Sequence, residues 1–215
     1  MTTHRGIMDG KVLLEKLRAT GLQVDAWWPA DVATPLARLV GGVLVQRTTW
    51  AAHAYPALQN LLAAGALRDA TTLLALPEAT LTEMIRCAGF YTTKPRAVRA
   101  ISQWWLEHKD DHSQMSDEVL RKSLDAVYGI GPESADLALI SVFNRGTFVA
   151  DKYARRLFTA AGLEAPKGYE PFHTYAMTLC DGLSHVEFQE LHSLKVEYGK
   201  LVSAKKVTYS ELFLQ

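Results

Sequence analysis

Residues 127–136 read Val-Tyr-Gly-Ile-Gly-Pro-Glu-Ser-Ala-Asp, and this stretch decides how the chain is organised. An apolar helix is expected before it, and a second helix is expected to begin at Pro132-Glu133. The Gly129-Ile130-Gly131 turn between the helices lets the backbone reverse without Cβ clashes and leaves N–H groups pointing outward. The N-terminus of the second helix attracts a phosphate through these groups and through its partial positive charge. The stretch therefore predicts a helical hairpin that holds a nucleic-acid backbone.

A single carboxylate, Asp151, follows the hairpin. It stands between apolar residues 148–150 and the basic Lys152, Arg155 and Arg156. Cleavage of an N-glycosidic bond builds positive charge on the sugar, which a fixed carboxylate stabilises while it orients the attacking water. An Asp ahead of a helical run is also typical of an N-cap. Because a phosphate-binding hairpin precedes it, Asp151 is predicted to be the catalytic acid of a base-excising enzyme.

Four segments together resemble the helix-hairpin-helix DNA glycosylases of the endonuclease III superfamily. They are the hairpin, Val149-Ala150-Asp151-Lys152-Tyr153, Leu44-Val45-Gln46-Arg47-Thr48-Thr49-Trp50 and Gly89-Phe90-Tyr91-Thr92-Thr93-Lys94. The likeness runs in consistent order from about Trp27 to Lys206, which is more specific than any one short motif.

This resemblance implies how double-stranded DNA containing a damaged base would be bound. The side chain of Gln46 would enter the duplex and fill the gap left by an everted base. The hairpin carbonyls of relatives hold a monovalent cation, which is an optional feature here. The predicted DNA contacts are Gln46, Gly129, Ile130, Gly131, Ser134 and Lys152.

Within the superfamily, Trp27-Trp28-Pro29, Glu133-Ser134-Ala135-Asp136 and Asp151-Lys152-Tyr153 look most like the bacterial 3-methyladenine DNA glycosylase III subfamily. The resemblance implies an aromatic pocket for alkylated purines. N3-methylated adenine is cationic, so an indole face attracts it more strongly than a normal base, and it is a good leaving group. The predicted substrate-binding residues are Trp27, Trp28, Pro29, Trp50, Glu133, Lys200 and Lys206. Tryptophans at these positions are also typical of core anchors.

Glu133 decides the expected reaction type. Bifunctional relatives carry a lysine at this position, which attacks the sugar as a Schiff-base nucleophile and then permits strand cleavage. A carboxylate cannot form that imine, and Lys152 matches no family nucleophile. The sequence therefore predicts a monofunctional glycosylase without AP-lyase activity, although Glu133 is also a favourable first-turn acid.

The expected cofactor content follows from the cysteines and the tail lysines. Many relatives bind a [4Fe–4S] cluster through four cysteines near the C-terminus, but this chain has only Cys87 and Cys180. No iron–sulfur cluster and no metal site are expected, and both cysteines are predicted to be buried. Lys200 and Lys206 match two pocket lysines of the subfamily, one of which can be carbamylated, so a carbamylated Lys200 is an option.

The overall charge does not by itself suggest a nucleic-acid binder, because 23 basic residues balance 23 acidic ones. Local distribution supports DNA binding better. Basic residues follow the Tyr91 turn, follow Asp151 and crowd the tail, although about half are expected to be ordinary solvated positions. They are Lys94, Arg96, Arg99, Lys152, Arg155, Arg156, Lys195, Lys200, Lys205 and Lys206.

Apolar spacing is helical almost throughout, and no alternating strand pattern of useful length occurs, so the fold class is all-α. Gly and Pro residues between the apolar runs mark the helix ends. The resemblance implies two helical subdomains with a cleft between them. Residues 28–133 would form a six-helix barrel-like domain, and residues 1–27 with 134–215 a second domain that carries Asp151.

The 215 residues are 48% hydrophobic, enough for a sizeable core, and contain no run long enough to span a membrane. The start, residues 1–5, lacks an apolar signal core, so a cytoplasmic, nucleoid-associated bacterial monomer is expected. The predicted function is excision of alkylated purines in base excision repair. Two alternatives stay open: an endonuclease III-like enzyme for oxidised or mismatched pyrimidines, and a non-catalytic DNA-structure binder.

Overall fold

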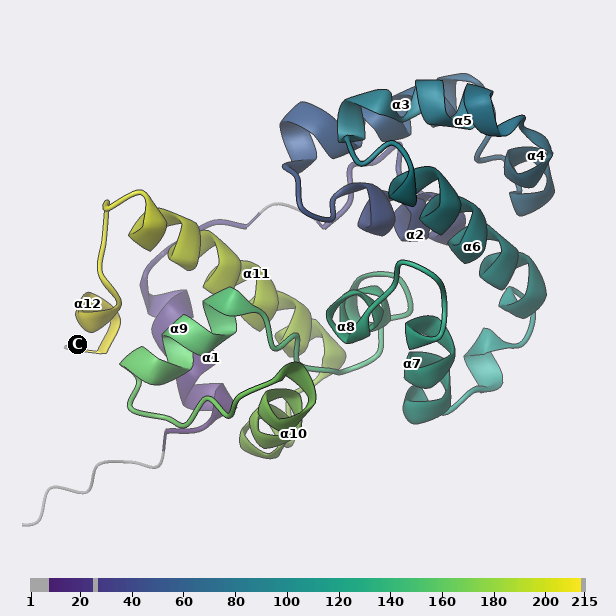
Figure 1. Cartoon of the computed structure of the whole chain (residues 1–215). Coiled ribbons are helices and arrows are strands. Elements are labelled where there is room, and N and C mark those ends of the chain that lie inside the picture. The colour runs from purple at the N-terminus through teal and green to yellow at the C-terminus, as the bar shows by residue number, and fades with distance from the viewer. Residues whose placement is uncertain (1–7, 25–26, 214–215) are drawn as a thin grey trace, which may run out of the picture. The chain divides into compact units, whose positions relative to one another are not determined.

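The computed structural model describes residues 8–24 and 27–213, and helices are the regular secondary structure of both ranges (Figure 1). The predicted all-α class is confirmed. The chain divides into two compact units, residues 27–143 and residues 1–26 together with 144–215. The prediction about residues 1–5 lies outside the described residues. No helix in the described ranges combines the length and apolarity that a bilayer crossing requires.

The middle unit, residues 27–143, is built from helices that surround one apolar core. In chain order they are α2 (Pro35–Leu44), η1 (Trp50–Ala54), α3 (Tyr55–Ala63), α4 (Ala70–Ala75), α5 (Glu78–Met84), η2 (Arg86–Ala88), α6 (Thr93–His108), η3 (His112–Gln114), α7 (Asp117–Asp125) and α8 (Pro132–Ser141). The helix α2 packs along α6, and α7 packs on α8 (Figure 1). The core of the middle unit includes the buried residues Leu39, Val43, Leu58, Leu73 and Val98.

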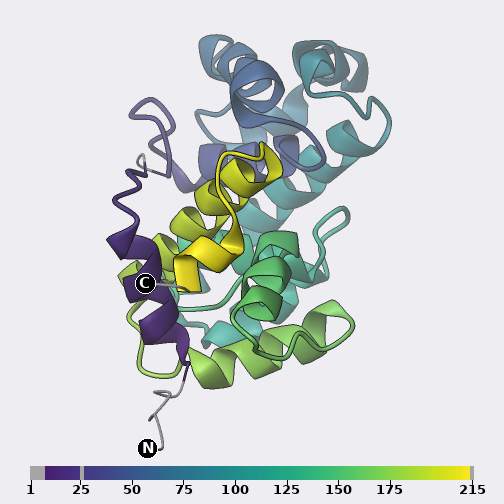
Figure 2. The ribbon, with the colours of Figure 1, turned by 90° about the vertical axis from the view of Figure 1, so that its left-hand side faces the viewer.

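The second unit contains the N-terminal helix and the last part of the chain. Its helices are α1 (Gly10–Ala19), α9 (Lys152–Ala160), α10 (Tyr169–Leu179), α11 (His185–Ser203) and α12 (Tyr209–Phe213). Both α1 and α9 pack against the long helix α11 (Figure 1). The short α12 closes on α1 and α9, and Figure 2 shows α12 (yellow) beside α1 (purple).

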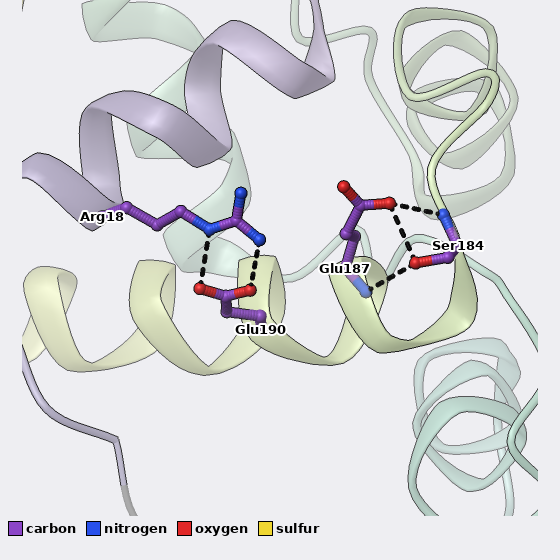
Figure 3. Close-up of polar contacts among 4 residues, drawn as sticks. All are labelled: Arg18, Ser184, Glu187 and Glu190. Atoms are coloured by element: carbon purple, nitrogen blue, oxygen red, sulfur yellow. Dashed lines mark hydrogen bonds and ion pairs between the residues drawn. The ribbon is translucent and has the colours of Figure 1, made fainter.

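Polar contacts fix the start of α11 and tie it to α1 (Figure 3). Ser184 caps the helix and exchanges hydrogen bonds with Glu187, which together form a capping box. One turn further along, the Arg18 guanidinium of α1 donates two hydrogen bonds to the Glu190 carboxylate, at 2.8 and 2.6 Å. The Arg18–Glu190 pair therefore joins two helices that lie far apart in the sequence.

The division between the units falls after α8 and not before it. The predicted boundary at 133/134 differs from the observed one at 143/144. The physical reason is that α8 buries Ala135 and Leu139 in the core of the middle unit, where it packs on α2 and α7. The whole helical hairpin therefore belongs to one unit.

Four short elements, η1, η2, η3 and α12, were not predicted, and one burial prediction is wrong. Cys180 is buried, and burial raises the pKa of its thiol to about 12. Cys87 is exposed, because it lies in the single turn η2 at the surface of the middle unit.

Candidate active site

The turn at residues 129–131 has the shape that the sequence predicts. Gly129 has φ +82°, and a Cβ on it would lie 2.5 Å from the Cβ of Ala97, so only glycine fits. The amide of Ile130 donates to the carbonyl of Val127 at 3.0 Å, which closes the turn. Gly131 occupies the N-cap position of α8, and none of the described side chains caps this helix. A helix start of this kind can bind an anion through its first-turn N–H groups.

Gln46 lies against the hairpin. Its amide nitrogen donates to the carbonyl oxygen of Gly129 at 3.0 Å and to the Ser134 hydroxyl at 3.1 Å. The structure thus brings together three of the residues predicted to contact DNA. With these bonds made, Gln46 braces the turn, so entry of its side chain into a duplex would require it to release both partners. Its role in filling the gap of an everted base stays a prediction.

An ion pair holds the two helices of the hairpin together. Asp136 of α8 is fully buried, and its carboxylate accepts two hydrogen bonds from the Arg121 guanidinium of α7, at 2.7 and 2.9 Å. Such a bidentate pair fixes geometry as well as adding energy. Sequence reasoning missed this pair, because nothing in the local pattern marks Asp136 as buried.

The basic residues after the Tyr91 turn serve the fold more than DNA. Lys94 is buried and donates to the carbonyls of Leu44 and Ala88, both at 2.7 Å, and burial lowers its pKa. Arg99 likewise donates to backbone carbonyls of the α4 region. Arg96 differs, since it is exposed and its guanidinium lies 3.7 Å from the Tyr128 ring centroid, beside the hairpin. Of these three residues, Arg96 is the one whose position suits a phosphate contact.

The predicted pocket aromatics Trp28 and Trp50 lie together in the middle unit. Their rings meet edge to face with centroids 5.5 Å apart, and Trp50 stacks on Tyr55 at the same separation. A Cβ on buried Gly41 would lie 3.0 Å from the Trp28 ring, so the absence of a side chain there makes room for the indole. Each indole is only partly buried against the core.

The indole nitrogen of Trp28 donates to the carbonyl of Ser141 at 2.9 Å, which fixes the ring's orientation. Trp27 and Pro29 are half-buried beside it. The structure agrees with the expectation that Trp28 and Trp50 are core anchors, because both rings pack against the core of the middle unit. Their role in binding a base stays a prediction.

A hollow of about 590 Å³ lies elsewhere in the middle unit, between η1, α3 and the Gly89 turn. Its lining includes His53, Asn60, Arg86 and Cys87, and none of the predicted site residues contributes. At its rim Phe90 and Tyr91 are exposed at 46% and 55%. Exposed aromatic rings of this kind are suited to stacking on nucleic-acid bases. Sequence reasoning used this segment only as a motif and did not name these two rings as contacts.

Asp151 lies in the second unit at the N-cap of α9. Its Oδ1 accepts from the amide of Ala154 at 2.7 Å, so the N-cap expectation is met. Its Oδ2 accepts from the Lys195 ammonium at 2.8 Å. Burial would raise the pKa of Asp151, but the charge of Lys195 and the hydrogen bonds from Lys195 and Ala154 outweigh it, and the pKa lies below its ordinary value. The carboxylate is therefore buried, oriented and ionised at neutral pH.

Lys195 and His192 are the neighbours of Asp151 that sequence reasoning missed. Lys195 was counted among surface cations of the tail, and this was wrong, because its exposed fraction is 1%. Its Nζ lies 3.0 Å from Nδ1 of His192. Burial and the Lys195 charge lower the pKa of His192 to about 3. In the sequence, only their separation of three positions on one helix could have linked His192 to Lys195.

The remaining predicted site residues lie at the surface. Lys200 is exposed and donates to Glu197 at 2.6 Å, and Lys206 is exposed just beyond the end of α11. Glu133 is exposed in the first turn of α8. Lys152 is exposed with its ammonium 4.9 Å from the Tyr153 ring centroid. No group of three or more His, Cys, Asp or Glu side chains in residues 8–24 and 27–213 could hold a metal ion.

Comparison with known proteins relates this arrangement to one family. The description "HhH-GPD superfamily base excision DNA repair protein" matches residues 40–181, which include the hairpin and Asp151. A protein of Methanocaldococcus jannaschii that is named as a DNA repair glycosylase is 31% identical over 187 residues, which cover 84% of this chain and 82% of that protein.

Two solved structures share the fold. The 3-methyladenine DNA glycosylase MagIII of Helicobacter pylori, bound to 1,N6-ethenoadenine, aligns with a TM-score of 0.74 and 23% identity, over 94% of this chain and 100% of that one. A trapped covalent complex of endonuclease III with DNA aligns with a TM-score of 0.67 and 16% identity, over 88% of this chain and 84% of that one. At these identities the likeness establishes the fold alone.

Proposed function

Since the chain belongs to the HhH-GPD superfamily of base excision DNA repair proteins, we propose that this DNA glycosylase is monofunctional and excises alkylated purines such as 3-methyladenine. The observation that carries the proposal is Asp151, a buried and ionised carboxylate that follows the phosphate-binding hairpin in the chain. The Trp28–Trp50 pair and the likeness to MagIII favour an alkylated purine as the base.

The proposed reaction needs little acid catalysis. When the bond between the sugar C1′ and the cationic base breaks, its electron pair moves to the base, which leaves neutral. The sugar takes on positive charge, and the Asp151 carboxylate stabilises that charge. A water molecule then adds to C1′ and loses a proton to solvent, which leaves an abasic site in an intact strand.

The chain's own residues account for the other steps. The Gly129-Ile130-Gly131 turn and the uncapped start of α8 would bind the DNA backbone, and Gln46 would support the turn or fill the vacated stack. The Trp28 and Trp50 indoles would attract an electron-poor, cationic base. We expect no iron–sulfur cluster, since two cysteines cannot supply four thiolates. Carbamylation of Lys200 remains part of the proposal only as an option.

The substrate assignment is tested by base release from a panel of duplexes. We expect free 3-methyladenine from methylated DNA and no release from duplexes that carry oxidised pyrimidines. Release from the oxidised pyrimidines alone would favour an endonuclease III-like enzyme. Tight binding to an abasic-site analogue without release of any base would indicate a non-catalytic DNA binder.

Replacement of Trp28 is expected to weaken excision of cationic bases selectively. Loss of a desolvated cation–π contact of about 2 kcal/mol corresponds to roughly a thirtyfold fall in kcat/KM for 3-methyladenine in Trp28→Leu. Trp105→Leu is the matched control, because Trp105 is also a half-buried tryptophan of the middle unit but packs on His112. Equal losses in the two variants would show that Trp28 acts only as a core anchor.

The absence of lyase activity has a separate test. Borohydride reduction of a mixture of the protein with abasic DNA should give no covalent adduct, because Glu133 cannot form an imine. Base release should leave a strand that breaks only after treatment with alkali. A trapped adduct would overturn the monofunctional assignment while leaving the glycosylase assignment in place.

A further inference from the structure

A fully buried lysine is costly, so the surroundings of Lys195 need an explanation. The ammonium bridges two side chains: it donates to Oδ2 of Asp151 at 2.8 Å and lies 3.0 Å from Nδ1 of His192. A lysine ammonium has donors only, so Nδ1 of His192 must accept. His192 is therefore neutral and carries its proton on Nε2. This arrangement holds the ammonium between one anion and one neutral acceptor.

The two oxygens of Asp151 are held by different elements. Oδ1 accepts from the backbone of α9 and Oδ2 accepts from the side chain of Lys195 on α11. Because α9 and α11 pack on each other, these two bonds fix the plane of the carboxylate relative to its unit. An N-cap alone would need only one of them.

We propose that Lys195 is a positioning residue of the glycosylase reaction: its ammonium keeps the Asp151 carboxylate charged and in one orientation, and neutral His192 aims the ammonium. The inference rests on the proposed function, since it concerns the same acid. Lys195 does not act as an amine nucleophile, because it is 1% exposed and its donors are engaged.

The charges around Asp151 agree with this assignment. Asp151 faces Lys195 and His192 of α11, and the charge of Lys200 also lowers the pKa of His192. On α12, burial is the main cause that raises the pKa of Tyr209. The charge of Asp151 also raises this pKa, and the charge of Arg156 on α9 lowers it. Among these neighbours Lys195 is the cation in contact with Asp151, and it is the chief reason that the pKa of this buried acid stays low.

The test compares Lys195→Met, Lys195→Arg and the wild type in two measurements. Without the ammonium, burial dominates and the pKa of Asp151 should rise. Activity needs the carboxylate, so the acid limb of the kcat/KM profile should move to higher pH by at least one unit in Lys195→Met. At pH values below both pKa values, a one-unit shift corresponds to about a tenfold loss beyond any loss at pH 8. In Lys195→Arg the acid limb should lie close to that of the wild type, because arginine returns a cation.

The second measurement does not depend on activity. Titration of the Asp151 carboxyl carbon by NMR should give an apparent pKa below the usual range in the wild type and above it in Lys195→Met. Lys11→Met is the control, since Lys11 is an exposed lysine of the same unit and both profiles should stay unchanged. If Lys195→Met does not fold, the Lys195→Arg and wild-type titrations decide, because a wild-type pKa at or above the usual value contradicts the inference.

The outcomes distinguish the positioning role of Lys195 from the proposed function. An unshifted acid limb and an unshifted Asp151 titration in folded Lys195→Met overturn the positioning role. A borohydride adduct that disappears in Lys195→Met also overturns it, since the lysine would then be a nucleophile. Failure of the wild type to release any base overturns the proposed function instead, and the NMR titration still decides the role of Lys195.

Discussion

Asp151→Asn is expected to lower the single-turnover rate of base release by at least about 100-fold while DNA binding is retained. Removal of one group that stabilises developing charge typically costs this much in rate. Asparagine is also a good N-cap, so the bond to the amide of Ala154 and the start of α9 should survive. The measurement is the rate of 3-methyladenine release together with binding of an abasic-site analogue.

The chain offers a matched control for this substitution. Asp9 caps α1 in the same unit, and its carboxylate accepts from the amide of Val12 at 2.9 Å. Asp9→Asn makes the same chemical change at an N-cap that the proposal does not use, so its rate should equal that of the wild type. Equal rates for Asp151→Asn and Asp9→Asn would show that Asp151 is a cap and nothing more.

Arg121→Met is expected to lower the free energy of unfolding by about 3 kcal/mol, because it removes the bidentate partner of fully buried Asp136. The value lies at the low end for a buried ion pair since the Arg121 side chain is 22% exposed. For a chain of this size, that loss of free energy should lower the melting temperature by roughly 6–12 °C. Calorimetry or circular dichroism provides the measurement.

Arg86→Met is the control for the stability experiment. Its ion pair with Glu83 lies at the surface of the same unit, with side chains 58% and 67% exposed, and such pairs contribute at most about 1 kcal/mol. A second variant, Arg121→Met with Asp136→Leu, should recover part of the loss, since it leaves no buried charge. If Arg121→Met and Arg86→Met have the same melting temperature, the Arg121–Asp136 ion pair does not hold the hairpin together.

The helices and the hairpin could be predicted from the sequence because their signals are local. Apolar residues at helical spacing, ended by Gly and Pro, marked α2, α6, α9 and α11, and the Gly129 turn depends on a backbone shape that only glycine adopts there. The short η1 and α12 carry too few residues for a periodic signal. Their ends are set by packing against other helices.

The surroundings of the candidate acid could not be predicted in the same way. Asp151 and Lys195 are 44 positions apart, and only the packing of α9 on α11 makes them neighbours. Lys94 and Lys195 looked like surface cations because composition does not reveal which lysines a fold encloses. Asp151 itself could be singled out, since the hairpin before it and the helix after it are both local features. Its partners needed coordinates.

The central claim is that this chain hydrolyses the N-glycosidic bond of an alkylated purine and leaves the strand intact. One reaction tests it most directly: the wild-type protein with methylated duplex DNA, in which free bases and strand integrity are measured together. The expected result is stoichiometric free 3-methyladenine and strands that break only after alkali. Strands cleaved without alkali, or methylated DNA returned with all its bases, would contradict it.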